Sequence, residues 1–133
     1  IDFNILREAF FNDEKLKESI ENFLYQKLPV TFLEKTKKLN QDFVIYDVPL
    51  LYEKGLDKLV DQVLVIYADV ETQKSRVQKR DGSELKLIEK IISQQIDIEA
   101  KKEKASWVIE NLGPKSQLEP KITSWLQEVT LSD

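Results

Sequence analysis

Cysteine and histidine are both absent from the 133-residue chain. The lack of cysteine excludes disulfide bonds, thiolate metal sites and thiol nucleophiles. The lack of histidine removes the commonest general base and metal ligand, so any chemistry must use carboxylates, lysines, arginines and backbone amides. No run approaches the roughly 20 apolar residues of a membrane-spanning helix. We therefore expect a cytoplasmic protein with no membrane partner.

Methionine is absent as well, and the chain begins at Ile1. Because an initiating methionine is normally removed only before a small residue, this start predicts a natural amino terminus upstream. Only three glycines and four prolines interrupt the sequence, which contains no repeat or linker. With 41% hydrophobic residues the chain can form one core, so we expect residues 1–133 to belong to a single domain.

The charge balance limits the partners further. Twenty basic and 24 acidic residues give a net charge of −4, so nothing attracts the whole surface to nucleic acid. We expect no nucleic-acid partner, and any phosphate site must be local.

Apolar residues at helical spacing open the chain. They predict helices over 2–12 and 13–38, with Asn12 or Asp13 as the cap between them. Pro29 indicates a kink or a helix boundary.

The period then changes to short apolar runs without alternation. The runs at 43–47, 63–67 and 107–109 are typical of strands buried on both faces of a parallel sheet. A charged helical region over 70–104 separates the last two, with Asp69 as the cap of its first part and Ser83 as the cap of its second. This order predicts an α/β domain whose ligands bind beyond the carboxyl ends of the strands.

The stretch DVPLLYEKG follows the first of these runs. Asp47 stands at the expected carboxyl end of a strand, Pro49 ends the ladder and Glu53 follows. A carboxylate there could orient a magnesium-bound water or a substrate hydroxyl near phosphates. Alternatively, Asp47 is a helix cap above two packed leucines.

Two arginines stand four residues apart in the 70–104 region. On a helix, Arg76 and Arg80 share one face and could form a fork for a polyphosphate. Alternatively, they belong to a solvated face that pairs with Glu71 or Asp81.

Two further polar positions have open interpretations. Gln95 falls on the expected apolar face of Ile88, six residues before Lys101, and needs a polar partner, which could be a backbone carbonyl. Asn111 and Gly113 end the third strand and could receive a purine edge, or form an ordinary strand-to-helix turn.

In combination these motifs resemble the dephospho-CoA kinase family. The family carries D-x-P-L-L-[FY]-E after a sheet strand, Q-x-x-R-x-x-x-R at the start of its lid, a glutamine followed by a lysine and an alanine, and V-I-x-N-x-G near adenine. The corresponding segments here are Asp47–Glu53, Gln73–Arg80, Gln95–Ala105 and Val108–Gly113.

The resemblance implies ATP-dependent phosphorylation of the 3′-hydroxyl of dephospho-CoA, with Mg²⁺, as the last step of coenzyme A biosynthesis. It implies CoA-binding helices over 1–40 and lid helices over 70–104. The catalytic residues would be Arg76, Arg80 and Asp47. The substrate-binding residues would be Pro49, Leu50, Leu51, Tyr52, Glu53, Gln95 and Lys101, and the nucleotide-binding residues Arg80, Asn111 and Gly113.

The sequence departs from the family pattern in three places. Tyr25-Gln26 stands where the family has His-Pro, and Ser106 stands where it has aspartate. The loop G-x-x-x-x-G-K-[ST] occurs nowhere. We therefore expect a partial P-loop NTPase-like three-layer fold, with the Mg²⁺ ligands mainly upstream, no metal site in this chain, and doubtful activity for the 133 residues alone.

Two hypotheses follow. The chain is either the carboxyl-terminal part of a dephospho-CoA kinase, or a non-catalytic relative that binds a nucleotide, CoA or a partner.

The family fold also raises a question about the sheet. Its strand before the phosphate loop lies between the strands that correspond here to 43–47 and 63–67, and this chain has no segment for it. We predict that 43–47 pairs directly with 63–67, or that a strand from a partner chain completes the sheet.

Overall fold

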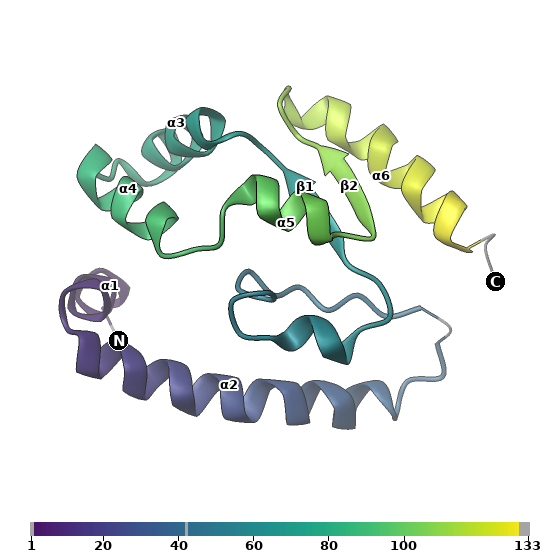
Figure 1. Ribbon diagram of the computed structural model, residues 1–133, viewed down its shortest axis with the longest axis horizontal. Helices are drawn as coiled ribbons and strands as arrows, with labels where there is room; N and C mark the ends of the chain where they lie inside the picture. Colours follow the sequence, from purple (N-terminus) through teal and green to yellow (C-terminus); the bar gives the residue numbers. More distant parts are fainter. Residues whose placement is uncertain (1, 42, 131–133) are drawn as a thin grey trace. The chain divides into compact units, whose positions relative to one another are not determined.

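The computed structural model describes residues 2–41 and 43–130 (Figure 1). They group into two compact units, residues 1–49 and residues 50–133. We call these the amino-terminal unit and the carboxyl-terminal unit, and each is described by itself.

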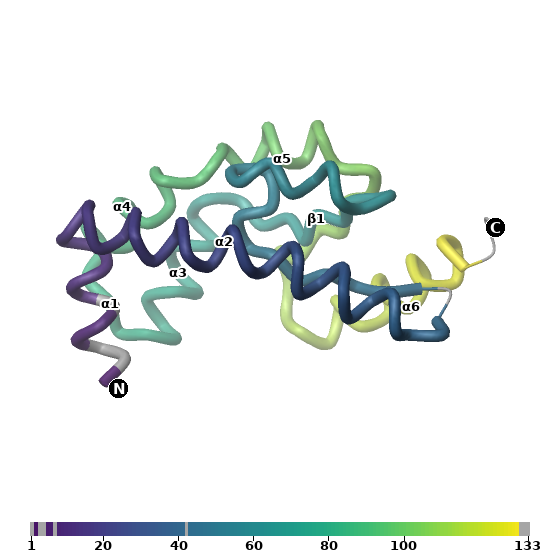
Figure 2. The backbone as a smooth tube through the Cα atoms, turned by 90° about the horizontal axis from the view of Figure 1, so that it is seen from below, coloured from purple at the N-terminus to yellow at the C-terminus, as the bar shows by residue number. Residues whose placement is uncertain are grey.

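The amino-terminal unit consists of two helices and an irregular segment. Helix α1 (Phe3–Asn12) and helix α2 (Glu14–Thr36) meet at Asp13, and Figure 2 shows α1 turning away from the start of α2. Asp13 Oδ1 accepts a hydrogen bond from the Leu16 amide at 3.0 Å, which satisfies one of the amides at the start of α2. Both predicted helices and the Asp13 cap are confirmed.

Of the two alternatives at Pro29, a kink or a helix boundary, the boundary is wrong and the kink stays a prediction. Helix α2 runs through Pro29 and ends at Thr36. Proline has no amide N–H, so the helix lacks one backbone hydrogen bond there, but the other hydrogen bonds of this long helix keep it continuous.

The predicted strand over 43–47 is also wrong, because these residues form no strand. The Tyr46 ring instead stacks on Phe32, with 3.8 Å between the ring centroids, while Phe43 and Ile45 are 40% and 67% exposed. A strand needs a neighbouring backbone to satisfy its N–H and C=O groups. No described segment pairs with residues 43–47, so the predicted direct pairing with 63–67 is wrong as well.

The carboxyl-terminal unit contains the sheet of the described chain. After a short 3₁₀ helix, η1 (Leu56–Leu59), strand β1 (Leu64–Tyr67) pairs in parallel with β2 (Trp107–Glu110). The Trp107 amide donates to the Val63 carbonyl at 3.0 Å and the Asn111 amide donates to the Tyr67 carbonyl at 2.7 Å, one at each end of the pair. The predicted strands at 63–67 and 107–109 are thus confirmed to within a residue.

Four helices accompany the strand pair: α3 (Val70–Asp81), α4 (Leu85–Ser93), α5 (Ile98–Lys104) and α6 (Lys115–Thr130). Helix α5 packs on β1 and α6 packs on β2, from opposite sides of the strands (Figures 1 and 2). Asp69 caps α3 as predicted, accepting a hydrogen bond from the Thr72 amide at 2.7 Å. The predicted cap at Ser83 is wrong, because the residue at the start of α4 is Glu84 and no side chain caps it. The unit therefore has helices on both sides of a parallel sheet, as the sequence predicts.

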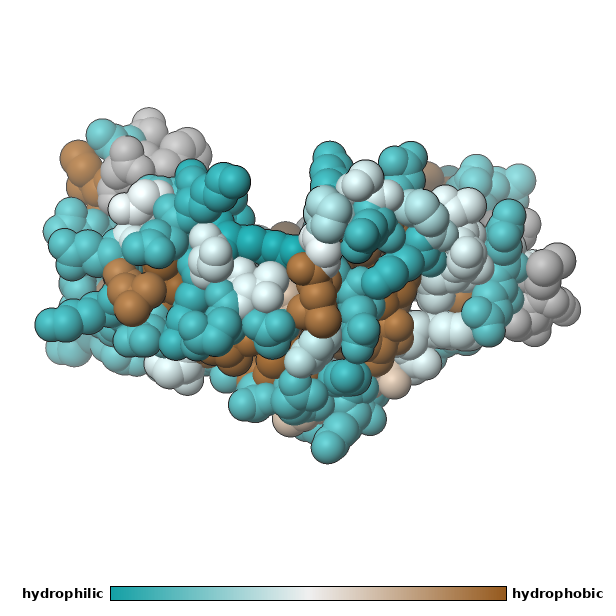
Figure 3. All heavy atoms as spheres, turned by 90° about the horizontal axis from the view of Figure 1, so that it is seen from above, coloured by the Kyte–Doolittle hydropathy of each residue, from teal (hydrophilic) through white to brown (hydrophobic). Residues whose placement is uncertain are grey.

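The buried side chains of the described residues all lie in the carboxyl-terminal unit. Ile88 is the most deeply buried at 1% exposure. The others are Leu56, Val65, Tyr67, Ala68, Ile109 and one charged residue, Lys101. On the face drawn in Figure 3, apolar residues form separate patches among polar ones. None of the described helices is long and apolar enough to cross a membrane.

Candidate functional site

A buried ion pair forms the centre of the first group of predicted site residues. Glu53 Oε1 lies 2.6 Å from Lys101 Nζ, and each side chain is 11% exposed. The same carboxylate oxygen accepts a hydrogen bond from the Ile96 amide at 2.9 Å. Lys101 Nζ also donates to Gln95 Oε1 at 3.4 Å. We call these four residues the Glu53 cluster.

Local turns place the members of this cluster. Glu53 lies in a turn that the Leu56 amide closes on the Leu51 carbonyl at 2.9 Å. Gly55 has φ +63°, a left-handed conformation that strongly favours glycine. At the other end, Asp97 caps α5 through the Glu99 amide, which places Lys101 one helical turn further on.

The ion pair decides the charge of Glu53. Burial alone would raise the pKa of its carboxyl group, but the hydrogen bonds from Lys101 and the Ile96 amide and the positive charge of Lys101 lower it overall. The carboxylate and the ammonium therefore neutralise each other. Lys101 is committed to a protein partner, so its main contact is structural.

Two buried oxygens beside this ion pair make no hydrogen bond within the described residues. They are Glu53 Oε2 and Tyr52 Oη. Burial, followed by the negative charge of Asp57, raises the pKa of the Tyr52 hydroxyl. Burying a polar atom without a hydrogen-bond partner costs free energy. These two oxygens therefore keep unused hydrogen-bonding capacity.

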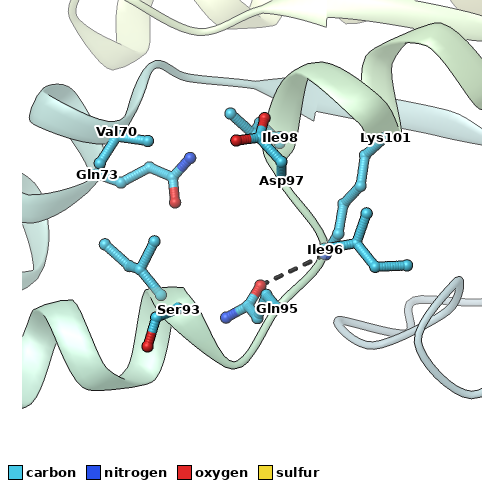
Figure 4. A pocket seen from close by; sticks show the side chains of 9 residues that line it. Val70, Gln73, Ser93, Gln95, Ile96, Asp97, Ile98 and Lys101 are labelled. Atoms are coloured by element: carbon cyan, nitrogen blue, oxygen red, sulfur yellow. Dashed lines mark hydrogen bonds between the residues drawn. The ribbon is translucent and has the colours of Figure 1, made fainter.

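A cavity of about 270 Å³ lies next to the cluster (Figure 4). Gln73 comes from α3, Gln95 from the segment after α4, and Lys101 from α5. The other lining residues are Val70, Ile92, Ser93, Ile96, Asp97 and Ile98. Val70 begins α3 directly after β1, so the cavity opens near the carboxyl end of that strand, where parallel sheets bind ligands.

Gln95 differs in one respect from the prediction. Helix α4 ends at Ser93 with Gln94 as its C-cap, so Gln95 follows the helix and does not share a helical face with Ile88. Its polar partner is the Lys101 ammonium and not a backbone carbonyl.

Arg76 forms the centre of a second group. Its Nη1 donates to the Asn111 carbonyl at 2.6 Å and its Nη2 donates to the Gly113 carbonyl at 2.9 Å. Two motifs more than 30 residues apart thus meet in one pair of hydrogen bonds. We call this arrangement the Arg76 clamp.

Arg80 has a different environment. Its side chain is 72% exposed and pairs with the neighbouring Asp81, with 2.7 Å between Nε and Oδ1. This contact agrees with the alternative interpretation of a solvated face. Arg76 and Arg80 share a helix, but their guanidinium groups bind different partners.

The turn after β2 is packed closely. A Cβ atom on Gly113 would lie 2.1 Å from Gln117 Oε1, so any larger residue would displace the Gln117 side chain. Lys121 Nζ donates to the Glu110 carbonyl at 2.7 Å, from α6.

Asp47 and Pro49 lie in the amino-terminal unit and are both exposed. The Glu53 cluster belongs to the carboxyl-terminal unit, so the roles of Asp47 and Pro49 stay predictions. Leu50 and Leu51 are half-buried in the turn that leads to Glu53.

Several contacts were not foreseen from the sequence. The Tyr67 hydroxyl donates to Glu99, which raises the pKa of Tyr67 to about 12, and Lys102 Nζ lies 4.5 Å from the centre of the Tyr67 ring. Ser106 Oγ, at the position where the family has aspartate, accepts from the Val63 amide at 3.1 Å. For the Ser106 contact, one signal is present in the sequence, which is that Ser106 directly precedes the strand β2.

Within the described ranges, no three acidic side chains lie close enough together to hold a metal ion.

Comparison with known proteins places the chain in a family. Residues 1–117 match the family model described as dephospho-CoA kinase. The dephospho-CoA kinase of Fusobacterium nucleatum is 33% identical over 129 residues, which are 97% of this chain and 67% of the relative. That of Campylobacter jejuni is 32% identical over 133 residues, or 98% of this chain and 66% of the relative.

Solved structures agree. The crystal structure of TT1252 from Thermus thermophilus superposes with a TM-score of 0.75 at 27% identity, covering 96% of this chain and 66% of that one. A dephospho-CoA kinase from Campylobacter jejuni gives a TM-score of 0.64 at 31% identity, covering 99% and 67%. The chain spans 57% to 67% of the length of the curated relatives. The sequence match, its extent and the shared fold together show that the chain belongs to the dephospho-CoA kinase family.

Proposed function

We propose that this chain is part of an enzyme that transfers the γ-phosphoryl group of ATP to the 3′-hydroxyl of dephospho-CoA. The observation that carries the proposal is the family match over residues 1–117. Two groups of motif residues from distant segments support it, the Arg76 clamp after β2 and the Glu53 cluster beside the cavity.

Phosphoryl transfer needs little covalent chemistry from the protein, so positioning and charge neutralisation supply most of the rate. Arg80 is the group we assign to the phosphates. Its side chain is 72% exposed on α3 and its guanidinium is bonded to the adjacent Asp81, so it can turn from that carboxylate to a phosphate oxygen that arrives from solvent. The planar fork of its guanidinium matches two phosphate oxygens.

The Glu53 cluster would serve a different purpose. Its ion pair ties the turn at 50–55 to α5, and this fixes the segment that follows Pro49. Leu50, Leu51 and Tyr52 would then present a stable surface to the acceptor, with Asp47 near the reacting hydroxyl. Gln95 would stay within reach of the acceptor through its place on the cavity wall.

The nucleotide base would border Asn111 and Gly113, with the Arg76 clamp behind the turn. When bound, Mg²⁺ would neutralise charge on the transferred phosphates. No carboxylate cluster for it exists in the part of the chain that the structure describes. The helices over 1–40 would contact the CoA moiety.

The test uses the full-length protein that contains this chain. It is incubated with ATP and dephospho-CoA, and coenzyme A is measured by mass spectrometry. We expect turnover, and we expect Arg80→Ala to lower kcat by about 10²- to 10³-fold. Lys79→Ala, at an exposed position on the same helix, is the matched control and should leave kcat unchanged. We expect no turnover from the 133-residue chain alone, since the phosphate loop motif is not in its sequence.

The Tyr25-Gln26 pair, which stands where the family has His-Pro, favours a second function, in which the chain binds a nucleotide, CoA or a partner without transferring phosphate. Calorimetric titration of the full-length protein with each ligand separates the two. Saturable binding with no coenzyme A formed would support the second function and overturn the first.

A further inference from the structure

The Arg76 clamp joins α3 to the turn after β2. Each of its two nitrogens bonds a different carbonyl, those of Asn111 and Gly113, at 2.6 and 2.9 Å. Both bonds involve a charged donor, so they are stronger than neutral ones. The guanidinium is therefore already occupied by backbone.

Different groups hold the two ends of this turn. The Asn111 amide is bonded to the Tyr67 carbonyl, which fastens the first residue to β1. Beyond it, Pro114 has no N–H to donate, so that part of the turn lacks one of its usual backbone anchors. The two hydrogen bonds from Arg76 to the carbonyls of this turn anchor it to α3 instead.

The clamp also sets the direction of the peptide groups. In a trans peptide the carbonyl of one residue points opposite to the N–H of the next, and the described chain has no cis peptide bond. Because the Asn111 carbonyl points at Arg76, the Leu112 N–H points away from α3. A fixed backbone N–H of this kind is a suitable donor for an acceptor nitrogen of a purine ring.

We propose that Arg76 is a positioning residue for nucleotide binding: it holds the 111–113 turn in the orientation that receives the base, and it does not itself bind phosphate. The inference rests on the proposed function and separates the roles of two arginines on one helix. Arg80 acts on the phosphates and Arg76 acts through the turn.

A lysine cannot reproduce this contact. Its single ammonium is a point donor, whereas the guanidinium carries two donors in a rigid plane at the spacing of the two carbonyls. Arg76→Lys therefore keeps the charge and removes the geometry, which makes it the informative variant beside Arg76→Ala.

The first test is kinetic and uses the full-length enzyme. We expect Arg76→Ala to raise KM for ATP about tenfold or more, since it removes two charge-assisted hydrogen bonds, with kcat within about threefold of wild type. Arg76→Lys should give an intermediate KM, and Lys79→Ala should change neither constant. A loss confined to kcat, with KM unchanged, would place Arg76 at the phosphates and overturn the proposal.

The second test does not depend on activity. Amide hydrogen exchange is measured on the same variants without ligand. We expect exchange at the Asn111 amide, which is bonded to the Tyr67 carbonyl, to accelerate about tenfold in Arg76→Ala when the turn loosens, while Ile109 in β2 keeps its wild-type rate. Unchanged exchange in the turn would overturn the clamp.

The two tests fail independently. If the wild-type protein forms no coenzyme A, the proposed function fails, and direct titration with ATP replaces the kinetic constants for judging Arg76. If coenzyme A forms but both Arg76 variants have wild-type KM and exchange, the proposed function stands and the positioning role is wrong.

Discussion

The two units of the chain use apolar residues differently. Phe23 in α2 is 63% exposed, and no described residue of the amino-terminal unit is buried. In the carboxyl-terminal unit, Ile88 is almost inaccessible, and side chains of η1 and of both strands are buried as well. Both sequences are rich in apolar residues, so composition alone does not produce a core. A core needs elements that cover one another, and the strand pair with helices on both sides supplies them.

The same difference explains the two apolar runs. Residues 43–47 and 63–67 look alike in sequence, yet only the second forms a strand. Strand β1 has β2 beside it, and the hydrogen bonds at Trp107 and Asn111 close the pair. The predictions below test this contrast.

The largest effect is expected at the buried ion pair. Lys101→Ala leaves the Glu53 carboxylate buried without its partner, and this should lower the free energy of unfolding by about 3–5 kcal/mol. Urea titration followed by tryptophan fluorescence measures it, because Trp107 and Trp125 are the two tryptophans of the chain and both lie in the carboxyl-terminal unit. Lys86→Ala, at an exposed position on α4, is the control and should change little.

The core comparison should give the next largest effect. Ile88→Ala opens a cavity in the carboxyl-terminal unit and should cost about 2–5 kcal/mol. Phe23→Ala should cost no more than about 0.5 kcal/mol, because the side chain is already exposed. Urea titrations followed by circular dichroism, which sees the helices of both units, give both values. Equal costs at the two positions would mean that Phe23 is packed, and the contrast between the units would be lost.

The acid dependence of stability follows from Glu53. Its pKa in the folded protein is below its ordinary value of 4.5, so the ionised carboxylate contributes stability that is present above pH 4.5. That contribution should disappear as pH falls through the lowered pKa, at about 1.4 kcal/mol per unit of pKa shift. Unfolding curves between pH 3 and 7 measure the slope. Glu53→Gln should flatten it, and a variant slope equal to wild type would remove Glu53 from this role.

The two helix caps should give the smallest effects. Asp69 and Asp13 each accept a hydrogen bond from the amide three residues on, in different units. Replacing either with alanine should lower the melting temperature of its own unit by about 2–5 °C. Fluorescence should report Asp69→Ala, whereas only circular dichroism should report Asp13→Ala. If fluorescence detects both changes equally, the units do not unfold separately.

Local rules predicted the elements that depend on nearby residues. Helices α1 and α2, the caps at Asp13 and Asp69, and the strands β1 and β2 follow from short patterns in the sequence. The predictions of a strand at 43–47 and of a helix boundary at Pro29 failed. Strand pairing and the stability of a long helix depend on residues outside the local pattern. Residue spacing cannot show whether a neighbouring backbone is present.

The site was predictable as a set of residues and less so as a set of contacts. The motif positions identified Glu53, Gln95 and Lys101 as neighbours in function, and the structure shows them bonded. The partners of Arg76 could not be predicted, because backbone carbonyls carry no signature in the sequence. The binding and catalytic roles of these residues, and that of Asp47, stay predictions.

The most direct test of this account is residue-resolved amide exchange on the 133-residue chain. The central claim is that β1 and β2 support the site within the carboxyl-terminal unit, while residues 43–47 have no strand partner. We expect the amides of Trp107 and Asn111, which are bonded across the strand pair, to exchange at least about a hundredfold more slowly than those of Val44 and Ile45. Protection of Val44 and Ile45 equal to that of Trp107 and Asn111 would contradict it, because it would mean that 43–47 is paired as a strand.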